Sequence, residues 1–265
     1  MSEQKKYSQL YPDIKDWPIY QLSEDRTNFI QEIDAFTLKR ISTKKTEELT
    51  NMIATTVYME RARIKEDSWK VDPPNDRLFW KKISSKLFNK AFEKDEKDAK
   101  VVVNDLLSRI IHRYSTEIVG TFKISTFKFA RKFLTLFFSR LLNAAANKNW
   151  ARLFGRKYSL YDKLKLYGEL DTVRSLFDHG TVIVVPTHFS NLDSILVGYA
   201  MDEMLGLPSF SYGAGLNLYN SGIAAYFMNR LGAYRVDRRK KNPIYLETLK
   251  AMSKLSIQRG VNSLF

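Results

Sequence analysis

The sequence predicts an α/β fold, in which a helical amino-terminal domain precedes a mostly parallel sheet covered by helices. Two observations support this prediction. Through residue 150, apolar residues recur at the spacing of amphipathic helices, whereas later in the chain short β-branched runs alternate with helical patterns. A chain of 265 residues has room for two domains. We therefore expect a helical domain at 1–150 and an α/β domain at 151–265.

Composition narrows the class of protein. Apolar residues make up 44% of the chain and aromatic residues 13%, which excludes a disordered chain. The chain has no cysteine, so neither a disulfide framework nor thiolate chemistry is expected. Residues 1–7 lead into a polar segment instead of an apolar run, unlike a signal peptide. No uncharged apolar run reaches the eighteen or so residues that a membrane span needs.

The helical half contains two clear amphipathic patterns, over Thr46–Lys65 and Val103–Ile118. The segment Asp72–Asp76, with two central prolines, predicts a break between them. His112 falls inside the second pattern. We interpret it as structural, because no other histidine or cysteine lies nearby to complete a metal site.

A third helix is predicted over Ile124–Ala146, where phenylalanine and leucine alternate with basic residues such as Lys128, Arg131 and Lys132. Its charges forbid a membrane span, but a basic helix rich in Phe and Leu suits the headgroup region of a membrane. The alternative is a buried helix that joins the two domains and whose basic side chains reach solvent. The sequence leaves both interpretations open.

The second half predicts alternating helices and strands, which indicates a mainly parallel sheet. Helices are expected at Tyr167–Asp178, Ile195–Met204, Ile223–Leu231 and from Pro243 to Arg259, and strands at Thr181–Val185, near Ser209–Tyr212 and at Ala233–Val236. Asn242 is expected to cap the last helix, with Pro243 at its first position and Gly260 at its end. His179 precedes a helix-ending glycine and is interpreted as structural.

The first chemical motif follows the strand at Thr181–Val185, an apolar run typical of a buried parallel strand. His188 comes just after this strand, at the carboxyl edge where open α/β sheets bind ligands. Five residues correspond to about 140° around a helix, so His188 and Asp193 cannot meet on one regular helix. They can meet if Ser190 or Asn191 caps a new helix that holds Asp193 in its first turn.

A histidine held by a carboxylate is the arrangement that general-base activation of a hydroxyl requires. The sequence therefore makes His188 and Asp193 candidate catalytic residues. The plainer alternative is that Asp193 only caps a helix and that His188 is a loop residue bonded to the backbone.

The second motif is Gly232–Arg238, which lies about 45 residues after His188. A short strand here brings Arg235 and Arg238 to its end, where guanidinium groups can clamp a phosphate. Arg239, Lys240 and Lys241 continue the basic run beyond the strand end and are poorer candidates.

The two motifs together resemble those of the glycerol-3-phosphate and lysophosphatidate acyltransferases, whose first motif is His-x4-Asp and whose second is a Gly-aromatic-hydrophobic-Arg block. The local sequence Thr187–Ser194, which includes Ser190 and Asn191, is close to the first motif of the family. Gly232 and Arg235–Arg238 correspond to the second. The resemblance covers about residues 150–265, and residues 1–150 are only generally similar to the helical domain of some family members.

This resemblance implies transfer of a fatty acyl group, in phospholipid synthesis, from acyl-coenzyme A or acyl carrier protein to glycerol-3-phosphate or lysophosphatidate. His188 would be the general base and Asp193 would orient it. Arg235 and Arg238 would hold the acceptor phosphate, with Ser190, Asn191 and Gly232 as further substrate-binding residues. No metal and no dissociable cofactor are implied.

The third motif of the family should follow the next strand, but the chain stops at Asn262–Phe265, where that strand is expected to begin. We expect a fragment whose acyltransferase domain is incomplete, because a chain that ends in a buried strand leaves an unpaired apolar edge.

The net charge of +14 is concentrated in two segments. Lys123–Lys165 holds eleven basic residues and one acid, and Arg230–Lys241 holds six and one. Such patches suit phosphates, nucleic acid or an anionic membrane surface, or are solvated faces. Nucleic acid is disfavoured, because no recognition motif accompanies the charge. We expect a cytoplasmic protein associated peripherally with anionic membranes. The alternative function is a membrane or scaffold protein with a degenerate acyltransferase domain.

Overall fold

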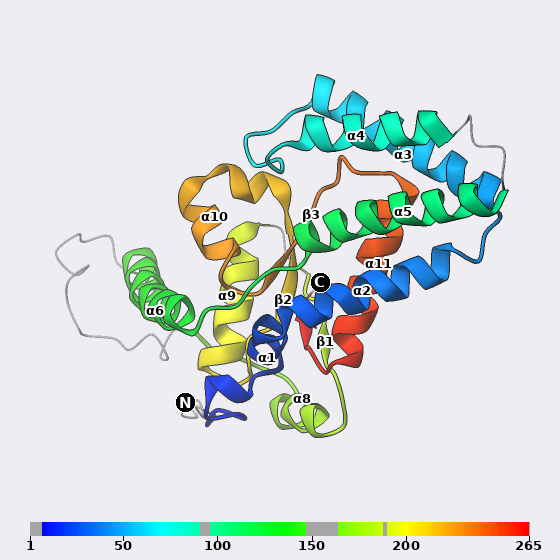
Figure 1. Cartoon of the computed structure of the whole chain (residues 1–265). Coiled ribbons are helices and arrows are strands. Elements are labelled where there is room, and N and C mark those ends of the chain that lie inside the picture. The colour runs from blue at the N-terminus through cyan, green and yellow to red at the C-terminus, as the bar shows by residue number, and fades with distance from the viewer. Residues whose placement is uncertain (1–6, 91–95, 147–163, 188–189, 265) are drawn as a thin grey trace.

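A computed structural model describes residues 7–90, 96–146, 164–187 and 190–264. Its elements confirm a general α/β architecture, with helices gathered in the amino-terminal half and a parallel sheet in the carboxyl-terminal half (Figure 1). The predicted domain boundary at residue 150 falls in 147–163, outside the described residues.

The amino-terminal half is helical, as predicted. Its elements are η1 (Ile14–Asp16), α1 (Pro18–Glu24), α2 (Arg26–Ile41), α3 (Thr46–Glu66), α4 (Asp76–Lys90), α5 (Glu96–Ile118) and α6 (Ile124–Ala146). The bounds of α6 are those that the sequence predicts, and α3 is one residue longer than predicted. Helix α5 begins seven residues before the predicted Val103.

The carboxyl-terminal half alternates helices with short strands. Its elements are α8 (Leu170–Ser175), η3 (Leu176–Asp178), β1 (Ile183–Val184), α9 (Asn191–Glu203), β2 (Ser211–Gly215), η4 (Leu216–Asn220), α10 (Gly222–Met228), β3 (Ala233–Val236), α11 (Pro243–Gln258) and β4 (Ser263–Leu264). Asn242 caps α11 as predicted, because its side chain accepts a hydrogen bond from Tyr245 N at 2.9 Å.

The described strands form one parallel sheet in the order β1-β4-β2-β3. Helices α9 and α11 lie on opposite sides of it (Figure 1). Parallel strands place their carboxyl ends at the same edge, so the segments that follow β1 and β3 emerge on one side of the molecule. Because β4 and β2 lie between them, these two segments start from opposite ends of that edge.

The largest apolar core is shared by both halves of the chain. It joins buried side chains of α2, α3 and α5, such as Phe29, Ile53 and Ile110, to Tyr234 in β3 and to Met252 in α11. Helix α11 packs against α2, α3 and α5. The helical half therefore supports the same sheet edge that carries the second motif.

The interpretation of the first strand as a buried one was wrong. Ile183 is 46% exposed and Val185 is 76% exposed. The reason is the place of β1 at the end of the sheet, where it pairs only with β4 among the described strands. A run of apolar residues cannot by itself distinguish an edge strand from a central one.

Candidate active site

The first motif forms a helix start of the predicted kind. Ser190 is the N-cap of α9, and its hydroxyl accepts a hydrogen bond from Asp193 N at 3.2 Å. In return, Asp193 Oδ2 accepts a hydrogen bond from Ser190 N at 3.0 Å. This reciprocal pair is a capping box. It fixes the Asp193 carboxylate on the first turn of α9.

His188 and Phe189 lie outside the described residues. Ser190 is exposed and Asp193 is half-buried, so the first turn of α9 is open to solvent. Asn191 is the first residue of the helix. The geometry therefore confirms the predicted cap and leaves the pairing of His188 with Asp193 a prediction.

The second motif, Gly232–Arg238, contains strand β3, and the bounds of this strand, Ala233–Val236, are those predicted. Gly232 precedes the strand with φ +81°, and a Cβ atom there would lie 2.1 Å from Ile19 Cδ1. Only glycine fits this combination of a left-handed backbone and a close neighbour. Gly232 thus has a structural reason to be glycine, and its predicted contact with substrate is not tested by this finding.

Arg235 is half-buried and has neutral partners. Its Nη2 donates a hydrogen bond to Asn229 Oδ1 at 2.6 Å, and its guanidinium carbon lies 4.8 Å from the centre of the Tyr219 ring. Burial raises the pKa of Tyr219 to about 12, even though Arg235 lowers it. Within the described part of the chain, no carboxylate forms an ion pair with Arg235. Its positive charge is therefore available to an anion.

Arg238 lies in the turn that follows β3 and is exposed. None of the hydrogen bonds and ion pairs among the described residues involves its side chain. The structure thus places Arg235 and Arg238 at the same strand end, but brings them into no common contact.

The next two basic residues are used by the fold. Arg239 pairs with Asp72 and with Asp237 Oδ2, the latter at 2.8 Å, and its guanidinium carbon lies 4.1 Å from the Trp69 ring centre. Lys240 is only 4% exposed and pairs with Glu117 of α5. The expectation that Arg239 and Lys240 are poor substrate ligands agrees with these contacts.

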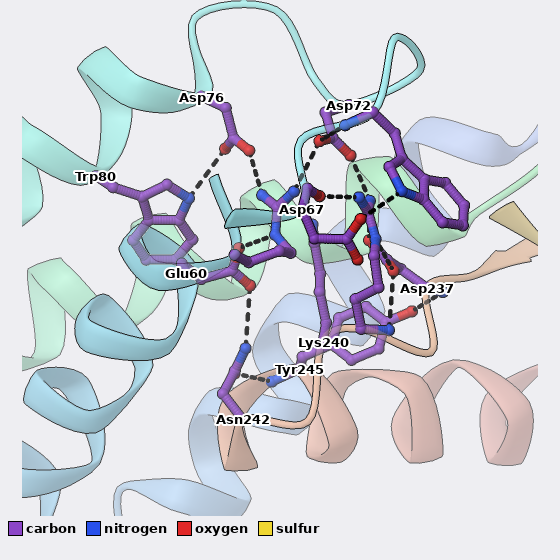
Figure 2. Close-up of polar contacts among 12 residues, drawn as sticks. Glu60, Asp67, Asp72, Asp76, Trp80, Asp237, Lys240, Asn242 and Tyr245 are labelled. Carbon is purple, nitrogen blue, oxygen red and sulfur yellow. Dashed lines mark hydrogen bonds and ion pairs between the residues drawn. The ribbon is translucent and has the colours of Figure 1, made fainter. Parts of the chain in front are cut away.

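These contacts belong to a buried polar network between α3, α4, α5 and the segment after β3 (Figure 2). Arg63, only 7% exposed, is its centre. It pairs with Glu60 Oε2 and Asp72 Oδ2, each at 2.9 Å, and with Asp76. We call this set the junction network; its members are Glu60, Arg63, Asp72, Asp76, Arg113, Tyr114, Glu117, Asp237, Arg239, Lys240 and Asn242.

The junction network shifts the pKa of its acids in opposite directions. Burial raises the pKa of Glu117 above its usual value, although Lys240 and Arg113 oppose this. Burial also acts to raise the pKa of Asp72, but hydrogen bonds from Arg239 and from Trp69 N outweigh it and leave that pKa lowered. The sequence indicated Asp72–Asp76 only as a break. Its role in the network could not be predicted, because its partners lie far away in the chain.

The two motif-bearing strand ends are well separated. Three steps of about 4.8 Å between neighbouring strands place β1 and β3 roughly 14 Å apart. A cavity of about 20 Å³ lies beside Arg235, and its lining also includes Lys240 and the acidic residues Glu117 and Asp237. This volume holds little more than one water molecule. A ligand held by both motifs would therefore lie along the carboxyl edge, near the ends of β4 and β2.

The described residues contain no group of three or more His, Cys, Asp or Glu side chains arranged to hold a metal ion. His112 is 62% exposed, and its Nδ1 lies 2.7 Å from Asp34 Oδ2. His179 is the C-cap of η3, where its backbone N–H donates to Leu176 O. In the described part of the chain, no helix is both long and apolar enough to cross a membrane.

Comparison with known proteins identifies no family for this chain. The sequence matches no protein-family model, and a search of curated proteins returned no match.

Proposed function

We propose that this protein is an acyltransferase-like enzyme that moves a fatty acyl group from an acyl thioester to glycerol-3-phosphate or lysophosphatidate. One observation carries the proposal. The capping box fixes the Asp193 carboxylate on the first turn of α9, five residues after His188 in the sequence, and within the described residues Arg235 at the end of β3 forms no ion pair with an acid. This arrangement combines the parts of a general-base site with a place for an anion.

In the proposed reaction, His188 takes the proton of the acceptor hydroxyl as its oxygen attacks the thioester carbonyl. The new C–O bond forms, the C–S bond breaks, and the proton passes from His188 to the departing thiolate. Asp193 orients the imidazole and stabilises its protonated form. The first backbone N–H groups of α9 are donors for the oxyanion that develops on the carbonyl oxygen.

The acceptor phosphate is assigned to Arg235, with Arg238 as a second contact from the turn that follows β3. Arg235 suits this role because its direct contacts are an amide and an aromatic ring, neither of which carries a negative charge. The separation of about 14 Å between β1 and β3 is larger than the span from hydroxyl to phosphate in either acceptor, so the long side chain of Arg235 has to reach along the sheet edge toward the first motif. Lysophosphatidate and glycerol-3-phosphate both carry the phosphate and hydroxyl that this arrangement needs.

Peripheral association with an anionic membrane surface is part of the proposal, because the products of such a reaction are amphiphiles. The donor is acyl-coenzyme A or acyl carrier protein, and no metal takes part in the proposed steps.

The experiment is an acyl-transfer assay on the full-length protein and its His188→Ala variant, with both acceptors and both donors. General-base catalysis contributes roughly 10²–10⁴-fold, so the variant should lose nearly all transfer while keeping its thermal unfolding midpoint. His112→Ala is the matched control, because His112 is exposed and pairs with Asp34 of α2.

Transfer by a folded His188→Ala variant at a rate near that of the wild type would refute the proposed mechanism. A wild-type protein that binds membranes but transfers no acyl group would instead be the alternative, a scaffold with a degenerate acyltransferase domain.

A further inference from the structure

Helix α6 presents a row of exposed apolar side chains. The exposed fractions are 59% for Phe129, 52% for Phe133, 54% for Leu136, 38% for Phe137 and 40% for Leu141. Their positions recur at intervals of three and four residues, which places them on one side of the helix. Exposed apolar residues scattered singly are ordinary, but a contiguous row of this size marks an interaction surface.

The opposite side of α6 already packs against α9. Phe138 is buried against Tyr199, with ring centres 5.3 Å apart, and Thr135 Oγ1 lies 2.9 Å from the Tyr199 hydroxyl. Arg131 pairs with the buried Asp202, its Nε 2.8 Å from Oδ2. Burial raises the pKa of Asp202 even though Arg131 opposes it. One side of α6 is therefore packed against α9, as expected for a buried helix. The other side is open, as expected for a helix that lies in the headgroup region of a membrane.

The open side continues onto α10. The rings of Phe129 and Phe227 stack with centres 6.1 Å apart and planes within 8°. On α10, Ile223 is 77% exposed and Tyr226 is 49% exposed. The two helices lie side by side on the same flank of the molecule (Figure 1). We call the exposed apolar residues of both helices the α6–α10 face.

The charges around this face identify its partner. Lys123, Lys128 and Lys132 are exposed on or just before α6, and the Arg230 guanidinium carbon lies 4.1 Å from the Tyr226 ring centre. Neither α6 nor α10 contains an acidic residue. An apolar row on two helices that carry no acidic residue, with exposed lysines beside it, matches the acyl chains and negative headgroups of an anionic lipid surface. A protein partner or a second copy of this chain would not require this charge pattern.

We propose that the α6–α10 face lies on an anionic bilayer, with its Phe and Leu side chains at the boundary between headgroups and acyl chains. This identifies the surface behind the membrane association proposed above. It can be tested separately, because lipid binding does not need His188. The packing of α6 links this face to the candidate site. The buried side of α6 packs against α9, and the first turn of α9 carries Asp193.

The test is co-flotation of the full-length protein with vesicles of phosphatidylcholine, alone or mixed with phosphatidylglycerol, at low and high salt. We expect binding to the mixed vesicles only, weakened by salt. A basic residue near an anionic leaflet contributes about fivefold in affinity. Lys128→Gln/Lys132→Gln should therefore weaken binding roughly 25-fold. Phe133→Ser/Phe137→Ser should abolish it. Arg131 is excluded from the test, because its pair with Asp202 supports the fold.

Matched controls come from α4, which is far from the α6–α10 face (Figure 1). Leu78 is 56% exposed and Lys82 is also exposed. Leu78→Ser and Lys82→Gln should leave binding unchanged, and circular dichroism checks that every variant is folded. Equal binding to both kinds of vesicle, no binding, or equal losses in the α4 controls would overturn the proposal. So would a second copy on this face, seen as a dimer that Phe133→Ser/Phe137→Ser dissociates without any effect on vesicles.

These outcomes are separable from failure of the catalytic proposal. Vesicle binding that survives in His188→Ala supports the face whether or not the protein transfers acyl groups. A variant that loses acyl transfer but still binds vesicles has a defect in the candidate active site and not in the α6–α10 face.

Discussion

The segments that follow β1 and β3 carry the two motifs of the proposed site, and they are held in different ways. The β1 end is an exposed edge of the sheet, and within the described residues its motif is fixed mainly by the capping box of Ser190 and Asp193. The segment after β3 is tied by the junction network to Glu60 of α3, to Asp72 between α3 and α4, and to Glu117 of α5.

This difference shows that the basic residues of Arg235–Lys241 have different roles. Of the basic residues that follow Val236, Arg239 and Lys240 pair with carboxylates, whereas Arg238 and Lys241 are exposed. Arg235, on the strand itself, is half-buried. The charge that the sequence presents as one patch is therefore partly structural. A buried ion pair is weak evidence for added stability, but removal of one partner leaves an uncompensated charge and is costly.

The largest expected effect is on the junction network. Arg63→Met should lower the free energy of unfolding by about 3–5 kcal/mol, because Glu60, Asp72 and Asp76 would lose their shared cation. Arg61→Met, an exposed neighbour on α3, should change it by less than about 0.5 kcal/mol. Urea unfolding of both variants measures this. Similar small effects would show that the β3 end does not depend on the network.

The next effect is at Gly232. Gly232→Ala forces a left-handed backbone on an L-residue and a Cβ atom into Ile19, which together should cost about 2–4 kcal/mol. Gly180→Ala is the control, since a Cβ atom there meets nothing within 4 Å. Thermal unfolding of the two variants compares them. A stable Gly232→Ala variant that has lost only acceptor binding would assign this glycine to the substrate instead.

Arg235→Ala tests the site itself. A charged contact to phosphate is worth roughly 1.5–3 kcal/mol, so the acceptor KM should rise about 10- to 150-fold while the donor KM changes little. Lys241→Ala, an exposed neighbour, serves as the control. Steady-state kinetics with each substrate varied in turn gives both constants. Small and equal changes in both would place Arg235 outside the acceptor site.

The smallest effect concerns pH. The pKa of Asp72 is lowered in the folded protein, so its ionised form contributes stability above its unfolded pKa. That contribution is lost as the pH falls through the folded pKa. The stability advantage of the wild type over Asp72→Asn should thus be constant near neutral pH and shrink in acid. Urea unfolding across acidic pH checks this, and an advantage that grows in acid would contradict it.

Local patterns predicted much of this fold. The bounds of α6 and β3 and the caps at Ser190 and Asn242 follow from periodicity and capping chemistry within a few residues. The junction network could not be predicted, because Arg239 meets Asp72 across 167 residues. The edge position of β1 was missed for the same reason, since strand order is a property of the whole sheet. The site was predicted as two motifs, but not how far apart the sheet places them.

The most direct test of the central claim is the acyl-transfer rate of Asp193→Asn in the full-length protein. Asparagine can still accept the hydrogen bond from Ser190 N, so the cap and the stability should be kept to within about 1 kcal/mol. An asparagine cannot stabilise a protonated His188, so transfer should fall by roughly 10²–10⁴-fold. A folded Asp193→Asn variant with transfer near the wild-type rate would show that Asp193 only caps α9, and would contradict the proposed pair.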